Sequence, residues 1–455
     1  MDALSRRSFL AAAAVAGTGE ERSRRVADPP VSARAALVAA ARSLGIETEP
    51  RRLADPENAP AVPRTTHRFH GTGLTAEASV RLIWLPLSRT DLRLCWRVAL
   101  CEERSGETFE ILIDAEKPED SREPWVRRHM SSHFSNATYR VFDSDNPKPM
   151  SPGHPTPNPC EPSQVGMVDI TLQALSLLGS PKGWIDDGVT ATIGNNADAH
   201  TDLRNKNQPF GAPMAPFHDP PRPQSATRSF TNHNPDLTLD PSAHRDAAVV
   251  NAFFWCNWIH DRLYDLGFNE TAGCFQQDNF ERGGVGNDAM IVEVQNGAFL
   301  GHRNGGNLIW DSTPADGGRA RLQLYLWVGP VPERDGAFDT EVILHEYVHG
   351  MTWRVVGKGN VFSANQTRGL GEGWSDFYAM ALPSQASDDV DGTYAYAAYS
   401  VREWRYAGIP LKENYYFGMR RYPYSTDLTK NPLRFSDLDV GNVNQYTAPR
   451  NPQYP

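Results

Sequence analysis

Two histidines four residues apart, in the segment His345-Glu346-Tyr347-Val348-His349, constrain this chain more than any other feature. On an α-helix, side chains at positions i and i+4 lie on one face about one turn apart, so both imidazoles can bind the same metal ion. Residues 338–344 combine a helix start pattern with an apolar run, which places the motif on a helix. The pattern therefore predicts a helix that carries two metal ligands.

A carboxylate next to the first histidine has the position of a general base. Glu346 can reach a water on the metal without binding the metal itself. Catalytic zinc has three protein ligands and one open position. Glu372 is the candidate third ligand, because a carboxylate that opens a second helix, packed antiparallel to the first, completes the set. We predict Zn²⁺ bound by His345, His349 and Glu372, with Glu346 as the catalytic base.

Asp376 stands four residues after Glu372 and therefore on the same helical face. It could accept a hydrogen bond from the ring nitrogen of a zinc histidine that does not bind the metal, which would fix the tautomer. The alternative for Asp376 is a solvent-exposed helix carboxylate. The alternative for the whole set is a buried helix whose histidines make ordinary hydrogen bonds. Gly350 and the glycine-containing residues 357–360 are predicted to end the first helix.

Further segments extend the pattern in a fixed order, at residues 251–255, 259–264, 267–270, 272–277, 282–284, 324–327 and 421–427. Together with the two motifs, they make the sequence resemble the fungalysin-type metallopeptidases, relatives of thermolysin in the Glu-zincin group. The resemblance covers about residues 139–437. It implies an α+β fold with a thermolysin-like two-lobed catalytic domain, over residues 138–455. It also implies zinc ligands at His345, His349 and Glu372 and a catalytic role for Glu346.

The sequence departs from the family after residues 421–427. Family members continue into a further helical portion, which contains a histidine thought to stabilise the tetrahedral oxyanion. No histidine follows His349 here, and the sequence ends at Pro455. We therefore expect a C-terminally incomplete catalytic domain, either from a longer reading frame or in a degenerate member. Loss of one oxyanion donor typically lowers the rate about 10²–10³-fold.

Residues 30–130 have a different pattern. A segment of helical composition at 33–44 precedes segments 78–86, 92–100 and 108–116, which alternate apolar and charged residues as strands do. A helix followed by an antiparallel sheet resembles the propeptide of fungalysin and thermolysin precursors. The resemblance implies that the chain's own propeptide acts as an intramolecular inhibitor or folding chaperone. A plain accessory β domain is the alternative.

The first 25 residues predict a twin-arginine export signal. Arg6 and Arg7 precede a short apolar segment, and residues 14–16 offer a small-residue cleavage site. The alternative is an incidental basic N-terminus. An export signal predicts a secreted protein, extracellular or periplasmic. No apolar run is long enough to span a bilayer.

The formal net charge of −10 argues against a general nucleic-acid-binding protein. Five cysteines, without metal-like spacing, define no disulfide framework, although one or two bridges could form in an oxidising compartment. Oxygen-rich loops at 194–241 could hold calcium, but without regular ligand spacing ordinary turns are favoured. Residues 246–266 predict a helix and residues 321–327 a strand.

Two segments are candidates for contact with substrate, but their sequences do not assign them that role. Residues 304–308 fall where family members have an edge strand that pairs with substrate, but their glycines depart from the family pattern. Arg420 and Arg421 could meet a substrate carbonyl, but pairing with acidic neighbours is favoured. We therefore assign no binding role to any of them.

The predicted function is a secreted zinc metalloendopeptidase that hydrolyses peptide bonds of extracellular proteins or peptides. Zinc would polarise the scissile carbonyl, and Glu346 would move a proton from water to the leaving amine. One alternative is a truncated, inactive member that binds peptides or regulates peptidases. Another is that the N-terminal sheet domain inhibits or assists a separate catalytic chain.

Overall fold

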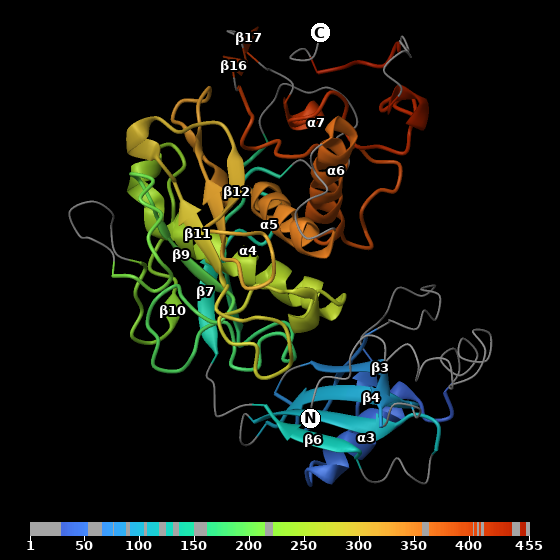
Figure 1. The fold of residues 1–455 in the computed structure, drawn as a ribbon. Coiled ribbons are helices and arrows are strands. Elements are labelled where there is room, and N and C mark those ends of the chain that lie inside the picture. The colour runs from blue at the N-terminus through green and yellow to red at the C-terminus, as the bar shows by residue number, and fades with distance from the viewer. Residues whose placement is uncertain are drawn as a thin grey trace. The chain divides into compact units, whose positions relative to one another are not determined.

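The computed structural model describes residues 29–52, 66–75, 77–87, 92–103, 107–117, 124–130, 136–149, 162–213, 222–356, 364–403, 405–406, 409–410, 414–438 and 446–451. The predicted export signal and Cys160 lie outside these residues. The chain mixes helices and strands and divides into two compact units (Figure 1). The first comprises Met1–Ser135, Gln173–Asp187 and Leu263–Gly267, and the second comprises Asn136–Leu172, Gly188–Arg262 and Phe268–Pro455.

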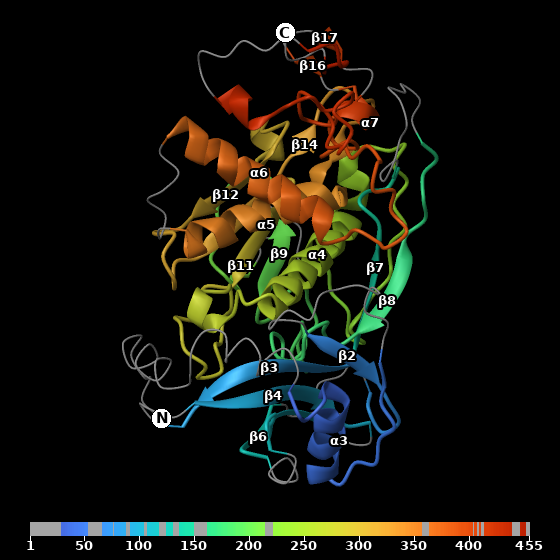
Figure 2. The same cartoon turned by 90° about the vertical axis from the view of Figure 1, so that its right-hand side faces the viewer.

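The first unit is a helix packed on an antiparallel sheet (Figure 2). The helix α3 spans Ala33–Ser43, and its Ser32 cap accepts a hydrogen bond from the backbone of Ala35. Its apolar face, including Leu37, is buried against the sheet. The strands follow one another in chain order: β1 Arg51–Arg52, β2 His67–His70, β3 Ala78–Pro86, β4 Leu92–Cys101, β5 Thr108–Asp114 and β6 Val126–His129. The predicted helix at 33–44 and the three predicted strands are confirmed.

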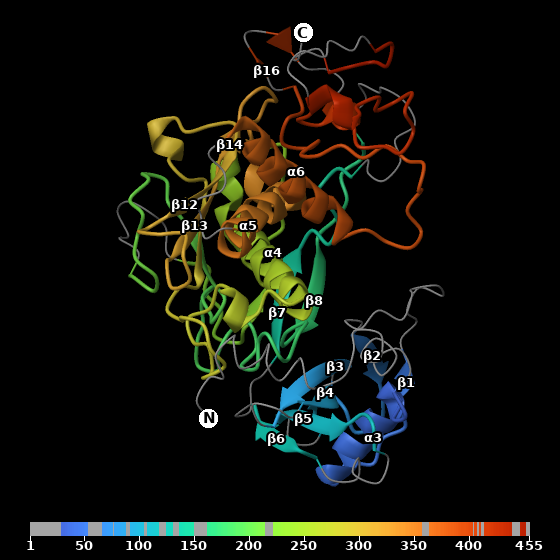
Figure 3. The same cartoon turned by 45° about the vertical axis from the view of Figure 1, so that its right-hand side comes forward.

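The second unit is built on a four-stranded sheet in the order β12-β13-β11-β9. Strand β11 pairs in parallel with both neighbours, and β12 is an antiparallel edge strand among those described. Helix α5 lies between the strands β12 and β13 on one side and helix α6 on the other (Figure 3). The bounds are β9 Ala197–Thr201, β11 Met290–Val294, β12 Gly306–Trp310, β13 Ala320–Leu324, α5 Thr340–Val355 and α6 Asn365–Ala381.

Shorter elements complete the described chain. Helix α4, Arg245–Asp265, confirms the predicted helix at 246–266. The remaining strands are β7 Ala137–Val141, β8 Val168–Leu172, β10 Ser229–Phe230, β14 Leu326–Trp327, β15 Arg334–Asp335, β16 Arg405–Tyr406 and β17 Ile409–Pro410. Helix α7 spans Asn414–Phe417, and 3₁₀ turns occur at Pro241–His244, Glu270–Ala272, Ala298–Leu300, Gly336–Phe338 and Phe435–Leu438.

The prediction of a single strand over residues 321–327 is wrong. Strand β13 ends at Leu324, and β14 belongs to a separate two-stranded sheet with β15. Tyr325 lies between them, and its N–H donates to the carbonyl of Gly305 while its carbonyl accepts from the N–H of Gly336. The backbone therefore changes hydrogen-bonding partner at this residue, which ends the first strand.

The prediction that Gly350 helps to end the first helix is also wrong. Helix α5 continues through Gly350 to Val355. A β-carbon at residue 350 would lie 2.8 Å from the Phe275 ring and 3.4 Å from Leu308. The glycine therefore permits close packing of the helix on these side chains. Residues 357–360 lie outside the described chain.

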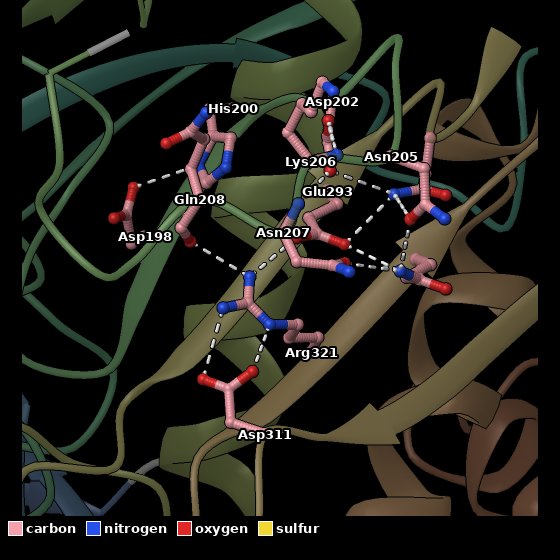
Figure 4. A network of polar contacts seen from close by, with 12 residues as sticks. Asp198, His200, Asp202, Asn205, Lys206, Asn207, Gln208, Glu293, Asp311 and Arg321 are labelled. Atoms are coloured by element: carbon pink, nitrogen blue, oxygen red, sulfur yellow. Dashed lines mark hydrogen bonds and ion pairs between the residues drawn. The ribbon is translucent and has the colours of Figure 1, made fainter.

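One face of the four-stranded sheet carries buried polar side chains (Figure 4). Because side chains alternate along a strand, Asp198 and His200 of β9, Glu293 of β11, and Arg321 and Gln323 of β13 share this face. Arg321 and Gln323 donate to the Glu293 carboxylate at 2.7 and 2.8 Å. The buried negative charge is thus hydrogen-bonded and paired, as burial of a carboxylate requires.

The pair formed by Asp198 and Arg222 makes stability depend on pH. Arg222 donates to both Asp198 oxygens, at 2.6 and 2.7 Å. Although burial opposes the shift, hydrogen bonds from His200 and Arg222 lower the pKa of Asp198 to about 2, against about 3.9 when unfolded. Because the folded state has the lower pKa, this stabilisation is complete above about pH 4 and disappears as the pH falls towards 2.

We expect Asp198→Asn to reduce the free energy of unfolding at pH 7 by about 3–5 kcal/mol, because Arg222 stays buried without its partner. Urea unfolding of both proteins at several pH values should show the difference shrinking below about pH 4. Asp169→Asn is the control, since Asp169 forms an exposed pair with Arg140 and should leave stability nearly unchanged. A difference that stays constant down to pH 3 would contradict this explanation.

Four of the five cysteines are buried and free: Cys95, Cys101, Cys256 and Cys274. They form no disulfide with one another, so the bridges that composition left open do not occur among them. None of the helices in the described chain has the length and apolar character needed to cross a membrane.

Candidate active site

Helix α5 presents the two motif histidines on one face. Their rings lie edge to face, with centroids 4.6 Å apart. His345 is buried and His349 half-buried, and the intervening Tyr347 and Val348 point into the core. The helix is buried almost throughout this segment, so packing around it fixes the direction of both imidazoles. Spacing alone predicts this arrangement.

Helix α6 brings a third side chain to the histidines. Glu372 oxygens lie 3.3 Å from Nε2 of His345 and 3.5 Å from Nε2 of His349. Glu372 does not open its helix as expected from the sequence, because α6 begins seven residues earlier, at Asn365. Its side chain is 53% exposed, so the site is open on that side.

The three groups converge as a candidate metal site. Ligand atoms of His345, His349 and Glu372 all lie within 4.8 Å of one another. Zinc bonds of about 2.0–2.1 Å in a tetrahedron separate neighbouring ligand atoms by about 3.3–3.4 Å. The 3.3 Å from His345 to one Glu372 oxygen and the 3.5 Å from His349 to the other are close to that separation. Two imidazoles and one carboxylate also form a donor set that zinc accepts.

Asp376 is held in place behind the site. One of its oxygens lies 2.8 Å from Nδ1 of His345. Arg420 donates to both of its oxygens, at 2.5 and 2.6 Å, and the Tyr424 hydroxyl donates at 2.5 Å. Although burial opposes the shift, the hydrogen bonds from His345 and Arg420 lower the pKa of Asp376 to about 2. Asp376 is fully buried, so the reading as a solvent-exposed carboxylate is wrong.

Arg420 joins this carboxylate to the pocket. It pairs with Asp376, in agreement with the favoured prediction of an acidic partner, and lies 3.5 Å from Glu372. Its guanidinium is also 4.7 Å from the centre of the Tyr396 ring. The same ring stacks on His345 at 4.8 Å. Tyr396 therefore packs between a candidate metal ligand and the arginine.

Glu346 is buried beside the histidines. Burial raises its pKa to about 7, with the charge of Glu372 adding to the shift and that of His345 opposing it. A β-carbon at Gly306 would lie 2.5 Å from a carboxylate oxygen of Glu346. The absence of a side chain at residue 306 therefore lets the backbone of strand β12 approach this carboxylate.

These side chains line a pocket of about 430 Å³. Residues 304–308 form one wall, with strand β12 beginning at Gly306. The other walls come from α5, α6 and the segment around Tyr396 and Arg420. Since β12 is an edge strand among those described, its unpaired side offers backbone groups to an extended peptide.

Sequence reasoning missed several pocket residues. Trp327, Tyr396 and Met419 line the pocket. Trp327 belongs to the segment 324–327, which carried the family resemblance without any assigned role, and Tyr396 and Met419 lie outside every segment that the sequence singled out. Tyr396 stands in a segment rich in tyrosine and alanine, which gives no signal for a site. The block at 421–427 was the nearest signal, because it directly follows Met419 and Arg420.

Comparison with known proteins identifies the family. The model of the fungalysin metallopeptidase family (M36) matches residues 157–449. The chain belongs to the fungalysin metallopeptidase family. The match includes both motifs and the segment that carries Arg420 and Tyr424.

Curated relatives of this fungalysin-family chain include several extracellular metalloproteinases. Extracellular metalloproteinase 2 of Arthroderma gypseum is 31% identical over 394 residues, which are 84% of this chain and 55% of the relative. Extracellular metalloproteinase 10 of Coccidioides posadasii is 31% identical over 389 residues, covering 84% and 54%. Extracellular metalloproteinase 4 of Trichophyton tonsurans is 37% identical over 261 residues, covering 57% and 36%. The chain spans about half the length of the first two.

Proposed function

We propose that this chain is a secreted zinc metalloendopeptidase that hydrolyses peptide bonds of extracellular proteins. The observation that carries the proposal is the convergence of His345, His349 and Glu372 within 4.8 Å of one another, with the buried Glu346 carboxylate in the same pocket. Family membership supports the reaction class. The relatives named above are extracellular metalloproteinases, which supports the location.

In the proposed site His345, His349 and Glu372 would hold zinc. When bound, zinc polarises the scissile carbonyl and makes water more acidic. Glu346 accepts a proton from the attacking water and returns it to the leaving amine. A buried carboxylate with a pKa near 7 suits this work, because it can gain and lose a proton near neutral pH.

Asp376 is proposed to orient His345. Its oxygen faces Nδ1, so Nδ1 carries the proton and Nε2 keeps the lone pair that a metal needs. Arg420 in turn holds Asp376 and lies against Glu372. Arg420 therefore positions both Asp376, which is proposed to orient His345, and Glu372, which is proposed to bind zinc.

We propose that residues 138–455 form a thermolysin-like two-lobed domain. The pocket supports this, because a sheet edge forms one wall and helices form the others. An extended substrate would pair its backbone with β12 while its scissile bond lies over Glu346. Residues 30–130 are proposed to be a propeptide, which serves as an intramolecular inhibitor or chaperone. Mass spectrometry of the mature protein should find cleavage between these two segments.

Zinc content and proteolysis test the proposed function together. We expect about one zinc ion per chain, because three ligands converge at a single point. Casein hydrolysis should disappear when a chelator removes the metal and return when zinc is added. Zinc binding without any hydrolysis would instead identify a peptide-binding or regulatory member. A protein without zinc would contradict the proposed site.

A further inference from the structure

The sheet of the first unit has a charged face opposite helix α3. The residues that pack under α3 include Val80, Trp96 and Ile111. Because side chains alternate along a strand, their sequence neighbours Arg81, Arg97 and Glu110 lie on the other face. The register of β2 with β3 places Arg68 on that face as well. We call Arg68, Arg81 and Arg97 together the arginine face.

The arginine face contacts the end of helix α4, which belongs to the same unit through Leu263–Gly267. Arg68 and Asp265 are 197 residues apart in the sequence, and Nη2 of Arg68 lies 2.8 Å from the Asp265 carboxylate. Ser176 donates to the other oxygen of this carboxylate at 2.8 Å. Arg81 donates to the backbone carbonyl of Asp265 at 3.3 Å. The last carbonyls of a helix carry partial negative charge, so Arg81 lies at the end of α4 that attracts cations.

The third arginine contacts the preceding residue of α4, the buried Tyr264. Arg97 pairs with Glu110 at 2.6 Å. Although burial opposes the shift, the charge of Glu110 raises the pKa of Arg97, and a hydrogen bond to Tyr264 adds to it. The arginine face therefore binds two consecutive residues at the end of α4.

The pair of Arg68 and Asp265 is only partly shielded from solvent. The two side chains are 24% and 13% exposed. Partial burial strengthens a charge pair, but salt can still weaken it. Arg68 also pairs with Glu77 at 3.0 Å. Loss of the Asp265 carboxylate would therefore leave Arg68 with an acidic partner.

These contacts join the two segments that maturation is proposed to separate. The arginine face lies in residues 30–130, whereas Asp265 lies in residues 138–455. Cleavage between the segments would leave the contacts in place. We propose that the arginine face is a docking surface that keeps residues 30–130 bound to the end of α4 after cleavage, with Asp265 as the central contact and ionic strength setting the rate of release. This inference rests on the proposed propeptide role.

The test is the lifetime of the cleaved complex. A recognition sequence for a specific protease replaces residues 131–135 of the full chain, and a chelator keeps the protein from digesting itself. Size-exclusion chromatography after cleavage follows the release of the N-terminal fragment. We expect Asp265→Asn to speed release about tenfold, because it removes a charge-assisted hydrogen bond. Asp169→Asn is the matched control, since Asp169 forms an exposed pair with Arg140 in the second unit and should leave the release rate unchanged.

Arg68→Gln tests the same pair from the other side. It should also speed release, and the double variant with Asp265→Asn should release more slowly than the product of the two single effects predicts. Raising NaCl from about 0.1 to 1 M shortens the Debye length from about 10 to 3 Å. This should speed release of the parent more than release of Asp265→Asn. Unchanged release in both single variants, or an equal salt effect on parent and Asp265→Asn, would overturn the proposal.

Peptidase activity separates this inference from the proposed function. After cleavage, the zinc-loaded protein should gain activity on a fluorogenic peptide as the fragment leaves, and it should do so sooner in Asp265→Asn. If release responds to the variants and to salt as expected but activity does not change, the docking surface is supported and the inhibitory role of residues 30–130 is wrong.

Discussion

Replacement of Glu346 by glutamine is expected to lower kcat for peptide hydrolysis about 10²–10⁴-fold, because the amide cannot accept a proton. The zinc content should not change, since Glu346 is not among the three groups that converge as ligands. The measurement is kcat on a fluorogenic peptide, combined with metal analysis of the same sample. An equal loss of zinc and activity would show that Glu346 supports the metal instead of the proton transfer.

Glu341→Gln provides a matched control on the same helix. Glu341 is buried one turn before His345 and accepts a hydrogen bond from the backbone of Ala397. Burial, together with the charges of Asp339 and Asp145, raises its pKa well above the usual value. The amide of glutamine is close in shape to the carboxyl group, and its oxygen can still accept the hydrogen bond from Ala397. This variant should therefore retain its activity, and a comparable loss in both variants would contradict a specific role for Glu346.

Replacement of Asp376 by asparagine is expected to affect both the metal and the fold. Loss of such a hydrogen-bond partner typically lowers metal affinity about 10–100-fold, because the ligand histidine loses its orientation. The same change leaves the mostly buried Arg420 without its charged partner, which costs about 3–5 kcal/mol of stability. A zinc competition titration measures the first effect and urea unfolding the second.

A double variant separates the two effects of Asp376. Adding Arg420→Gln to Asp376→Asn removes the unpaired cation, so part of the lost stability should return. The zinc affinity should stay low, because His345 still lacks its carboxylate. If zinc affinity recovers along with stability, Asp376 acts only through the fold, and its proposed orienting role is wrong.

Local spacing accounts for what the sequence predicts well. Helix α5, the shared face of its two histidines and the approach of Asp376 all follow from the periods of three to four residues on a helix. Strands β3, β4 and β5 of the first unit follow from alternation in the same way, whereas β1, β2 and β6 were not predicted. Neither case needs information about distant parts of the chain.

Several failures involve contacts between distant residues. Gly350 looked like a helix terminator, but its role depends on Phe275, which lies far earlier in the sequence. The break at Tyr325 depends on backbone partners from two different segments, Gly305 and Gly336. Tyr396 joins the site because its ring meets His345 and Arg420, and no local pattern encodes such a meeting.

The hydrogen bonds that fix Asp376 also set the order in which a competent site can arise during protein synthesis. Helices α5 and α6 emerge from the ribosome before Arg420 and Tyr424, which hold this carboxylate. A nascent chain that ends after α6 already contains every proposed zinc ligand, but it lacks the groups that keep Asp376 against His345. Tight metal uptake should therefore be a late event, which follows release of residues 420–424 into the folding domain.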